Sequence, residues 1–140
     1  MRILAVDYGT VRTGLAISDP TGLIATPFGV FPGYDTEKLA GKICEVVCEK
    51  KVTGIIMGMP VRTDGKKSEM QEKILSFAEL LSVKTGINIE FVDEKFTTVI
   101  ASQKLHQNNK NAKQKKKIID AAAAAVLLQD WLDSRRKNLN

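Results

Sequence analysis

The sequence is poor in the residues that soft-metal and redox sites require. Its 140 residues include one histidine, His106, and two cysteines, Cys44 and Cys48. Zinc sites usually combine several cysteine and histidine ligands, so a zinc centre is not expected. The two cysteines are four positions apart, which stacks them on one helix face, and we expect both to be reduced and structural. A metal bound by this chain would be a hard one, held by carboxylates.

Long apolar runs are also missing. None approaches the roughly 20 residues that a membrane-spanning helix requires, and the apolar stretch after Met1 is too short for a signal peptide. Hydrophobic residues make up 44% and charged residues 26% of the chain, the balance of an ordinary globular domain. The sequence therefore predicts one domain over residues 1–140, cytoplasmic and without membrane contact.

Aromatic residues are scarce, at 6%, so stacking on single-stranded bases is expected to be secondary. Positive charge is abundant: 21 Lys and Arg stand against 16 Asp and Glu, which favours an anionic partner. One basic cluster comprises Lys110, Lys113, Lys115, Lys116 and Lys117, and another closes the chain at 135–137. Such clusters are typical of nucleic-acid binding, although they are also typical of solvated loops.

Hydrophobic patterning predicts alternating strands and helices. The expected strands are residues 2–7, 14–18, 23–31, 54–59 and 87–92, and the expected helices are about 36–51, 68–86, 97–106 and 115–132. Residues 107–117 are expected to form a mobile loop. Short connections favour antiparallel hairpins, and helical crossovers imply parallel strands. The prediction is an α/β fold: a mixed five-stranded sheet, ordered 3-2-1-4-5, with the first three strands antiparallel and helices on both faces.

Three acids are expected to meet at one rim of this sheet, because sites in such folds form beyond the carboxyl ends of parallel strands. Asp7 ends the first strand, and Asp93-Glu94 end the last one. Asp120 precedes eight apolar residues, beginning with five alanines whose small side chains would let the helix approach the sheet. Converging carboxylates repel one another unless a cation neutralises them. We therefore expect Asp7, Glu94 and Asp120 to be catalytic and to bind Mg²⁺ or Mn²⁺, as two ions about 4 Å apart.

Each acid also has a purely structural interpretation. Asp7 could only form a turn, Asp93-Glu94 could only cap a helix, and Asp120 could pair with a nearby lysine. For any one of them alone the structural interpretation is favoured. Their predicted convergence on one rim reverses that preference.

The segment from Asp7 to Gly14 reads Asp-Tyr-Gly-Thr-Val-Arg-Thr-Gly. Its glycines would let backbone N–H groups approach a phosphate, and Arg12 could contact that phosphate through two N–H groups. A tight hairpin turn explains the same residues equally well. The lysines at 110–117 immediately precede Asp120, so they could hold a nucleic-acid backbone while the acids act.

The chain resembles the YqgF or RuvX family of Holliday-junction-resolvase-like nucleases, within the ribonuclease H superfamily. Four motifs carry the resemblance over nearly the whole chain. They are Asp7-Tyr8-Gly9 with Arg12, Gly14, Ala16 and Ser18-Asp19; Gly58-Met59-Pro60-Val61 with Asp64-Gly65; Asp93-Glu94 with Thr97-Thr98; and Ile119-Asp120-Ala121-Ala122-Ala123. This chain has Lys95 where the family usually has Arg. Lysine keeps the positive charge but lacks the planar guanidinium that can donate two parallel hydrogen bonds. The chain also has Arg62-Thr63 in place of Asn-Met.

The resemblance implies a ribonuclease H-like fold, with Asp7, Glu94 and Asp120 as metal-binding acids and Lys95 beside them. It implies a cytoplasmic bacterial nuclease that processes the 5′ end of precursor 16S ribosomal RNA, or alternatively a resolvase of branched DNA. Two other classes stay open from the residues. They are a nucleotide-binding module, which would need a partner chain, and a non-catalytic RNA-binding or transcription factor. The resolvase alternative calls for a homodimer, whereas RNA trimming needs only a monomer.

Overall fold

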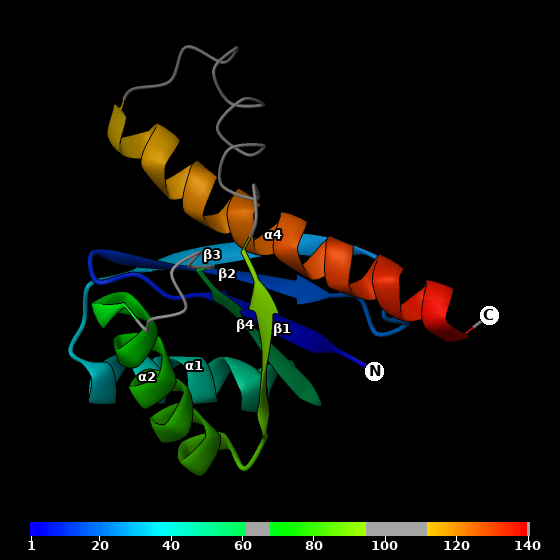
Figure 1. Ribbon diagram of the computed structural model, residues 1–140, viewed down its shortest axis with the longest axis horizontal. Helices are drawn as coiled ribbons and strands as arrows, with labels where there is room; N and C mark the ends of the chain where they lie inside the picture. The colour runs from blue at the N-terminus through cyan, green and yellow to red at the C-terminus, as the bar shows by residue number, and fades with distance from the viewer. Residues whose placement is uncertain (61–67, 95–111, 140) are drawn as a thin grey trace.

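The computed structural model describes residues 1–60, 68–94 and 112–139, and describes only the backbone of 112–120 and 137–139. Five strands and three helices lie in this part of the chain (Figure 1). The strands are β1 (Ile3–Asp7), β2 (Arg12–Ser18), β3 (Ala25–Pro32), β4 (Gly54–Met59) and β5 (Ile89–Asp93), and the helices are α1 (Thr36–Glu49), α2 (Glu69–Thr85) and α4 (Ala112–Leu139). No helix among the described residues is long and apolar enough to cross a membrane.

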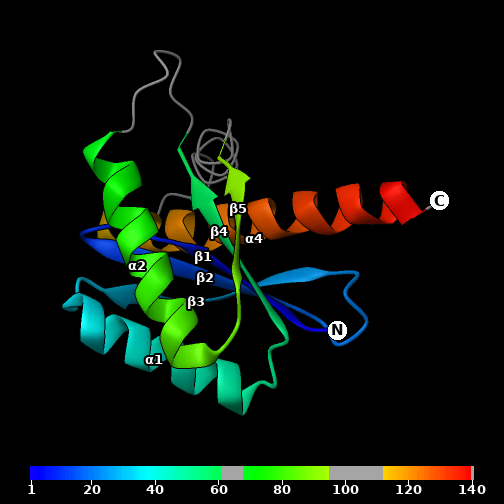
Figure 2. The ribbon, with the colours of Figure 1, turned by 60° about the horizontal axis from the view of Figure 1, so that its bottom comes forward.

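The predicted sheet is confirmed. Its strand order is β3-β2-β1-β4-β5, with antiparallel pairing of β1 to β2 and β2 to β3. β1 pairs with β4, and β4 with β5, in parallel. Helices α1 and α2 cover one face of the sheet and α4 crosses the other (Figures 1 and 2). Strands β1, β4 and β5 run in the same direction, so their carboxyl ends lie at the same rim of the sheet.

Side chains along β1 alternate between two separate cores. Leu4 and Val6 are buried with the apolar residues of α1 and α2, whereas Ile3 and Ala5 are buried beneath α4. The same alternation places Ile56 of β4 under α4. Residues of odd number in β1 and even number in β4 therefore face α4, which decides the face on which a side chain at the rim emerges.

Helix α4 packs on a strip of small residues. Ala5 and Ala16 are opposite each other in the β1–β2 register, and both are fully buried together with Ala124 of α4. Further along the helix, Leu127, Leu128 and Leu132 are also buried against the sheet. The alanine run of α4 thus packs directly on the sheet, because small side chains on both surfaces allow a close approach.

The long helix corrects two sequence-based predictions. Residues 112–117 are helical rather than part of a loop, and α4 continues to Leu139 instead of ending near Leu132. Lysine, glutamine and arginine are good helix formers without being apolar, so apolar spacing alone underestimates the length of such a helix. The helix predicted at 97–106 and residues 107–111 lie outside the described part of the chain.

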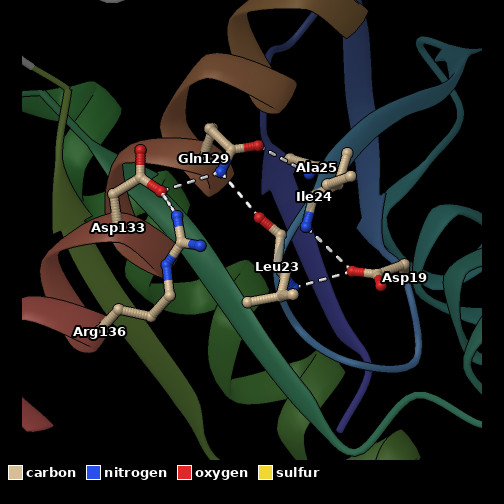
Figure 3. A network of polar contacts seen from close by, with 7 residues as sticks. All are labelled: Asp19, Leu23, Ile24, Ala25, Gln129, Asp133 and Arg136. Carbon is tan, nitrogen blue, oxygen red and sulfur yellow. Dashed lines mark hydrogen bonds and ion pairs between the residues drawn. The ribbon is translucent and has the colours of Figure 1, made fainter.

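The β2–β3 connection is organised by the carboxylate of Asp19. Its Oδ1 accepts the backbone N–H groups of Leu23 at 2.8 Å and Ile24 at 2.9 Å, and its Oδ2 accepts the N–H and hydroxyl of Thr21. Figure 3 shows the carboxylate beside Leu23 and Ile24. The hydroxyl of Thr21, followed by these backbone donors, holds the pKa of Asp19 well below its ordinary value.

Helix α4 is fastened to this connection by Gln129. Its Nε2 donates to the carbonyl of Leu23 at 3.0 Å, and its Oε1 accepts from the N–H of Ala25 at 2.9 Å (Figure 3). The amide also donates to Asp133 at 3.1 Å, and Asp133 pairs with Arg136. The two hydrogen bonds from Gln129 to the backbone of the β2–β3 connection fix the position of α4 along the sheet. They lie at the end of the sheet opposite the Asp7 rim.

Replacing Gln129 with alanine is expected to destabilise the fold by about 1–2 kcal/mol, because the part-buried N–H of Ala25 and the exposed carbonyl of Leu23 both lose their partner. Urea unfolding of the parent and Gln129→Ala measures this difference. Asp130→Ala is the matched control, since Asp130 is the exposed neighbour on the same helix and should change stability by less than about 0.5 kcal/mol. Equal losses in both variants would contradict the fastening role of Gln129.

The lowered pKa of Asp19 predicts a pH dependence of stability. A group whose pKa is depressed on folding contributes stability above its unfolded value, about 3.9, and that contribution disappears as the pH falls towards the folded value. The parent should therefore lose thermal stability progressively below about pH 4. Asp19→Asn should be less stable at neutral pH and should show a shallower acid limb. An unchanged acid limb in thermal melts across pH 2–7 would argue against this carboxylate as the source.

Candidate active site at the sheet rim

The rim at the end of β1 carries Asp7 on the face covered by α4. Asp7 is the last residue of β1 and pairs with Gly14 of β2. It has the same parity as Ile3 and Ala5, which are buried under α4. The side chain is only half-buried, so it is in the position and state of exposure that a ligand-binding carboxylate requires.

Glu94 reaches the same place from β5. Its backbone N–H donates to the carbonyl of Met59 at 3.1 Å, which fixes it one residue beyond the end of the strand. The parallel register pairs Gly58 with Val92 and Met59 with Asp93, so Glu94 and Val92 share a face. Val92 packs beneath α4. The carboxylate of Glu94 therefore lies on the same face of the sheet as Asp7.

Gly58 leaves the space that Glu94 occupies. A Cβ atom built at this buried glycine would lie 2.7 Å from Cγ, Cδ and Oε1 of Glu94, closer than real Cβ contacts. The Glu94 side chain thus runs directly over the backbone of β4, the strand that separates β5 from β1. The register between β1 and β4 pairs Val6 with Met57, so the next residues along are Asp7 and Gly58. Glu94 thus lies over the glycine that neighbours Asp7 across the β1–β4 register.

Sheet alternation also distinguishes Glu94 from its neighbour Asp93. Asp93 pairs with Met59, is exposed, and has the parity of Ile89, which packs on the α1 and α2 side. The two adjacent acids therefore emerge on opposite faces, and only Glu94 faces Asp7. The sequence analysis named Glu94, which the structure places on the face of Asp7, but it did not recognise Gly58 beside it. A glycine inside a fully apolar strand is the signal that would have found it, because it often marks a close approach.

The third predicted acid is only partly described. The backbone at Asp120 lies in α4, one helical turn before the buried Ala124. Its side chain lies outside the described part of the structure. Within the part that is described, no three or more Asp, Glu, Cys or His side chains are grouped closely enough to hold a metal ion. Asp7 and Glu94 thus share one face and one rim of the sheet, whereas the convergence of all three acids and metal binding stay predictions.

The connection after Asp7 is a tightly packed turn. A Cβ at Gly9 would lie 2.4 Å from the carbonyl oxygen of Arg12, so only glycine fits there. The hydroxyl of Thr13 donates to the Gly9 carbonyl at 3.4 Å, and Gly33 packs against the carbonyl of Thr10. The hairpin interpretation of this segment is therefore confirmed, and a phosphate contact by Arg12 stays a prediction. Arg12 is half-buried at the start of β2.

The predicted basic contacts fall largely outside the described side chains. Lys95 and Lys110 lie outside the described residues, and only the backbone of Lys113, Lys115, Lys116 and Lys117 is described, in the first turns of α4. These four lysines therefore belong to the helix that carries Asp120 rather than to a separate loop.

Comparison with known proteins places the chain in a family. The RuvX family model, described as "Holliday junction resolvase", matches residues 1–134. A protein of Rhodopirellula baltica named "Putative pre-16S rRNA nuclease" is 37% identical over 135 residues, covering 96% of this chain and 78% of the relative. One of the same name from Chloroflexus aurantiacus is 36% identical, covering 99% and 90%.

Solved resolvases share the fold. RuvC of Thermus thermophilus, in complex with a Holliday junction substrate, superposes with a TM-score of 0.62 at 13% identity, over 98% of this chain and 96% of that one. The fowlpox virus resolvase in complex with junction DNA gives 0.59 at 18% identity, over 96% and 99%. The sheet order, the acids at its rim and these matches establish that the chain belongs to the RuvX family of ribonuclease H-like nucleases.

Proposed function

We propose that this protein is a metal-dependent nuclease that hydrolyses phosphodiester bonds at the 5′ end of precursor 16S ribosomal RNA. The observation that carries the proposal is the Glu94 carboxylate lying over Gly58, on the face and rim where Asp7 emerges. Two carboxylates on one face of a partly exposed rim favour the binding of a cation. Their oxygen atoms are the ligands that Mg²⁺ and Mn²⁺ prefer.

The residues fit a divalent-metal centre of the carboxylate type. Asp7 and Glu94 would hold the metal from the sheet, and Asp120 would complete the set from α4, which starts at this rim and runs back across the face. A pair of bound ions would supply an activated water and stabilise the leaving oxygen. The basic first turns of α4 and Arg12 would hold the phosphate backbone beside the acids. Glu94 is positioned by its N–H bond to Met59 and by the hollow at Gly58.

The choice of ribosomal RNA rests on the names of the curated relatives. The description of the matching family, "Holliday junction resolvase", supports branched DNA as the second candidate substrate. The two candidates differ in a measurable requirement: symmetric junction cleavage needs a twofold dimer, whereas trimming one RNA end does not. Sedimentation alongside cleavage of a precursor 16S transcript and a four-way junction separates them.

Removing the charge of a metal-binding acid is expected to abolish cleavage. Asp7→Asn, Glu94→Gln and Asp120→Asn should each cut the rate on the preferred substrate by at least about a hundredfold, since each removes an anionic ligand. Asp93→Asn is the matched control, because its carboxylate is adjacent to Glu94 but on the opposite face. Calorimetric Mn²⁺ titration gives a readout independent of activity and should weaken in the first three variants only.

Parent-like cleavage by all three acid variants would overturn the metal site. A parent that cleaves neither substrate but binds RNA with a steep salt dependence would favour the non-catalytic RNA-binding alternative.

Adding one methyl group at Gly58 is expected to disable the site without changing its chemistry. In Gly58→Ala the new Cβ would collide with three atoms of Glu94 and displace its carboxylate. A displacement of about 1 Å at a catalytic centre can cost about a hundredfold in rate. Gly29→Ala is the control, because a Cβ at that strand glycine meets nothing within 4 Å. Similar rates for both variants, with parent-like circular dichroism, would contradict the proposed role of the hollow.

A further inference from the structure

A cavity opens near the Asp7 rim on the face of the sheet that α1 and α2 cover. It has a volume of about 370 Å³ and is bounded by the residue after Asp7 and by one side of α2. Tyr8, Phe77 and Leu80 supply its apolar walls, and Glu72, Lys73 and Ser76 supply polar groups. Nothing in the proposed metal chemistry uses these residues.

The apolar walls are held rigidly. The rings of Tyr8 and Phe77 are stacked, with centroids 4.8 Å apart and planes inclined by 19°. Phe77 is 1% exposed and belongs to the core, whereas Tyr8 is only half-buried. The Tyr8 side chain is therefore braced from the protein side while part of it stays accessible at the cavity. A flat, preformed apolar surface of this kind suits a planar ligand.

The polar groups include both hydrogen-bond acceptors and donors. Lys73 Nζ lies 3.5 Å from Oε1 of Glu69, so this ion pair engages the first acid of α2. Glu72, one turn along, is exposed and lines the cavity. Ser76 follows it by four residues on the same side of the helix. A carboxylate and a hydroxyl thus stand along one edge of a cavity with an aromatic wall.

The cavity is close to the metal site because Tyr8 follows Asp7 directly. Successive residues at the end of a strand point to opposite faces, so Asp7 faces α4 and Tyr8 packs on the α1 and α2 side. A nucleic-acid strand with a phosphate at Asp7 can therefore place a neighbouring base over the rim and into this cavity. That base must be unpaired, since a base within a duplex is stacked and hydrogen-bonded to its partner.

We propose that this cavity binds an unpaired guanine of the RNA substrate next to the cleaved bond. The inference rests on the proposed nuclease function and adds a preference for a single-stranded guanine. Guanine presents two parallel N–H donors on its pairing edge, which match the two oxygens of the Glu72 carboxylate, while its plane packs on the Tyr8 wall. Adenine presents an acceptor at the equivalent ring nitrogen and would be repelled. Low aromatic content predicted little stacking, yet two aromatic residues adjoin the site here.

Neutral nucleosides test the pocket without involving phosphate contacts or cleavage. The full-length protein, without metal, is titrated with guanosine, inosine and adenosine while amide chemical shifts are recorded by NMR. Guanosine should bind about tenfold or more tightly than adenosine, and inosine, which lacks the exocyclic amine, should lie between them. The shifts should centre on Tyr8 and on Glu72 to Leu80.

Variants separate the pocket from non-specific binding. Glu72→Gln should lower guanosine affinity about tenfold and erase the preference over adenosine. Glu79→Gln is the control on the same helix, since Glu79 lines the groove on the β5 side instead. In a nuclease assay, Glu72→Gln should lose the preference for a guanine beside the cut, whereas Glu79→Gln should keep it.

Equal affinity for guanosine and adenosine, or an unchanged guanosine affinity in Glu72→Gln, would overturn the proposed pocket. If the parent binds guanosine but cleaves no nucleic acid, the pocket is supported and the nuclease proposal is overturned. If the parent cleaves nucleic acid but binds no nucleoside, the nuclease proposal is supported and the pocket is overturned.

Discussion

Small side chains between α4 and the sheet allow the two to approach closely. Ala5 and Ala16 on the strands meet Ala124 on the helix. The helix can therefore lie close to β1 and β2, with its basic first turns directed to the rim that carries Asp7. A larger residue in this strip would push the helix away from the sheet, so the position of the α4 backbone at Asp120 depends on this packing.

Alternation along the strands then assigns a separate task to each face of the rim. Asp7 and Glu94 emerge towards α4, where basic residues are concentrated, and Tyr8 and Asp93 emerge towards α1 and α2. The positions of Asp7 and Glu94 depend on buried, parallel strands rather than on flexible loops. Such placement restricts the movement of both carboxylates, as the proposed metal site requires. The tight turn at Gly9 adds to this rigidity by packing its backbone against Arg12.

The opposite end of α4 is secured independently of the site. Gln129 bonds to the backbone of the β2–β3 connection, whose shape is maintained by Asp19. Ser18-Asp19 is part of the family motif, and the structure gives it a structural role far from the acids: Ser18 accepts the N–H of Ile3 at 2.8 Å, and Asp19 closes the connection. Helix α4 is thus fixed to the sheet at the end opposite the rim that carries Asp7.

The sequence by itself determined the sheet order, the antiparallel hairpins and the rim at which Asp7 and Glu94 lie, because strand periodicity and connection length are local properties. It did not determine the length of α4, since lysine-rich turns carry no apolar period. Only the tertiary structure decided that Gly58 makes room for Glu94, that Asp93 faces away from Asp7, and that Gln129 fastens the helix. Those facts arise where segments distant in sequence become neighbours. A glycine in an apolar strand indicates a close approach, but it does not indicate which side chain makes it.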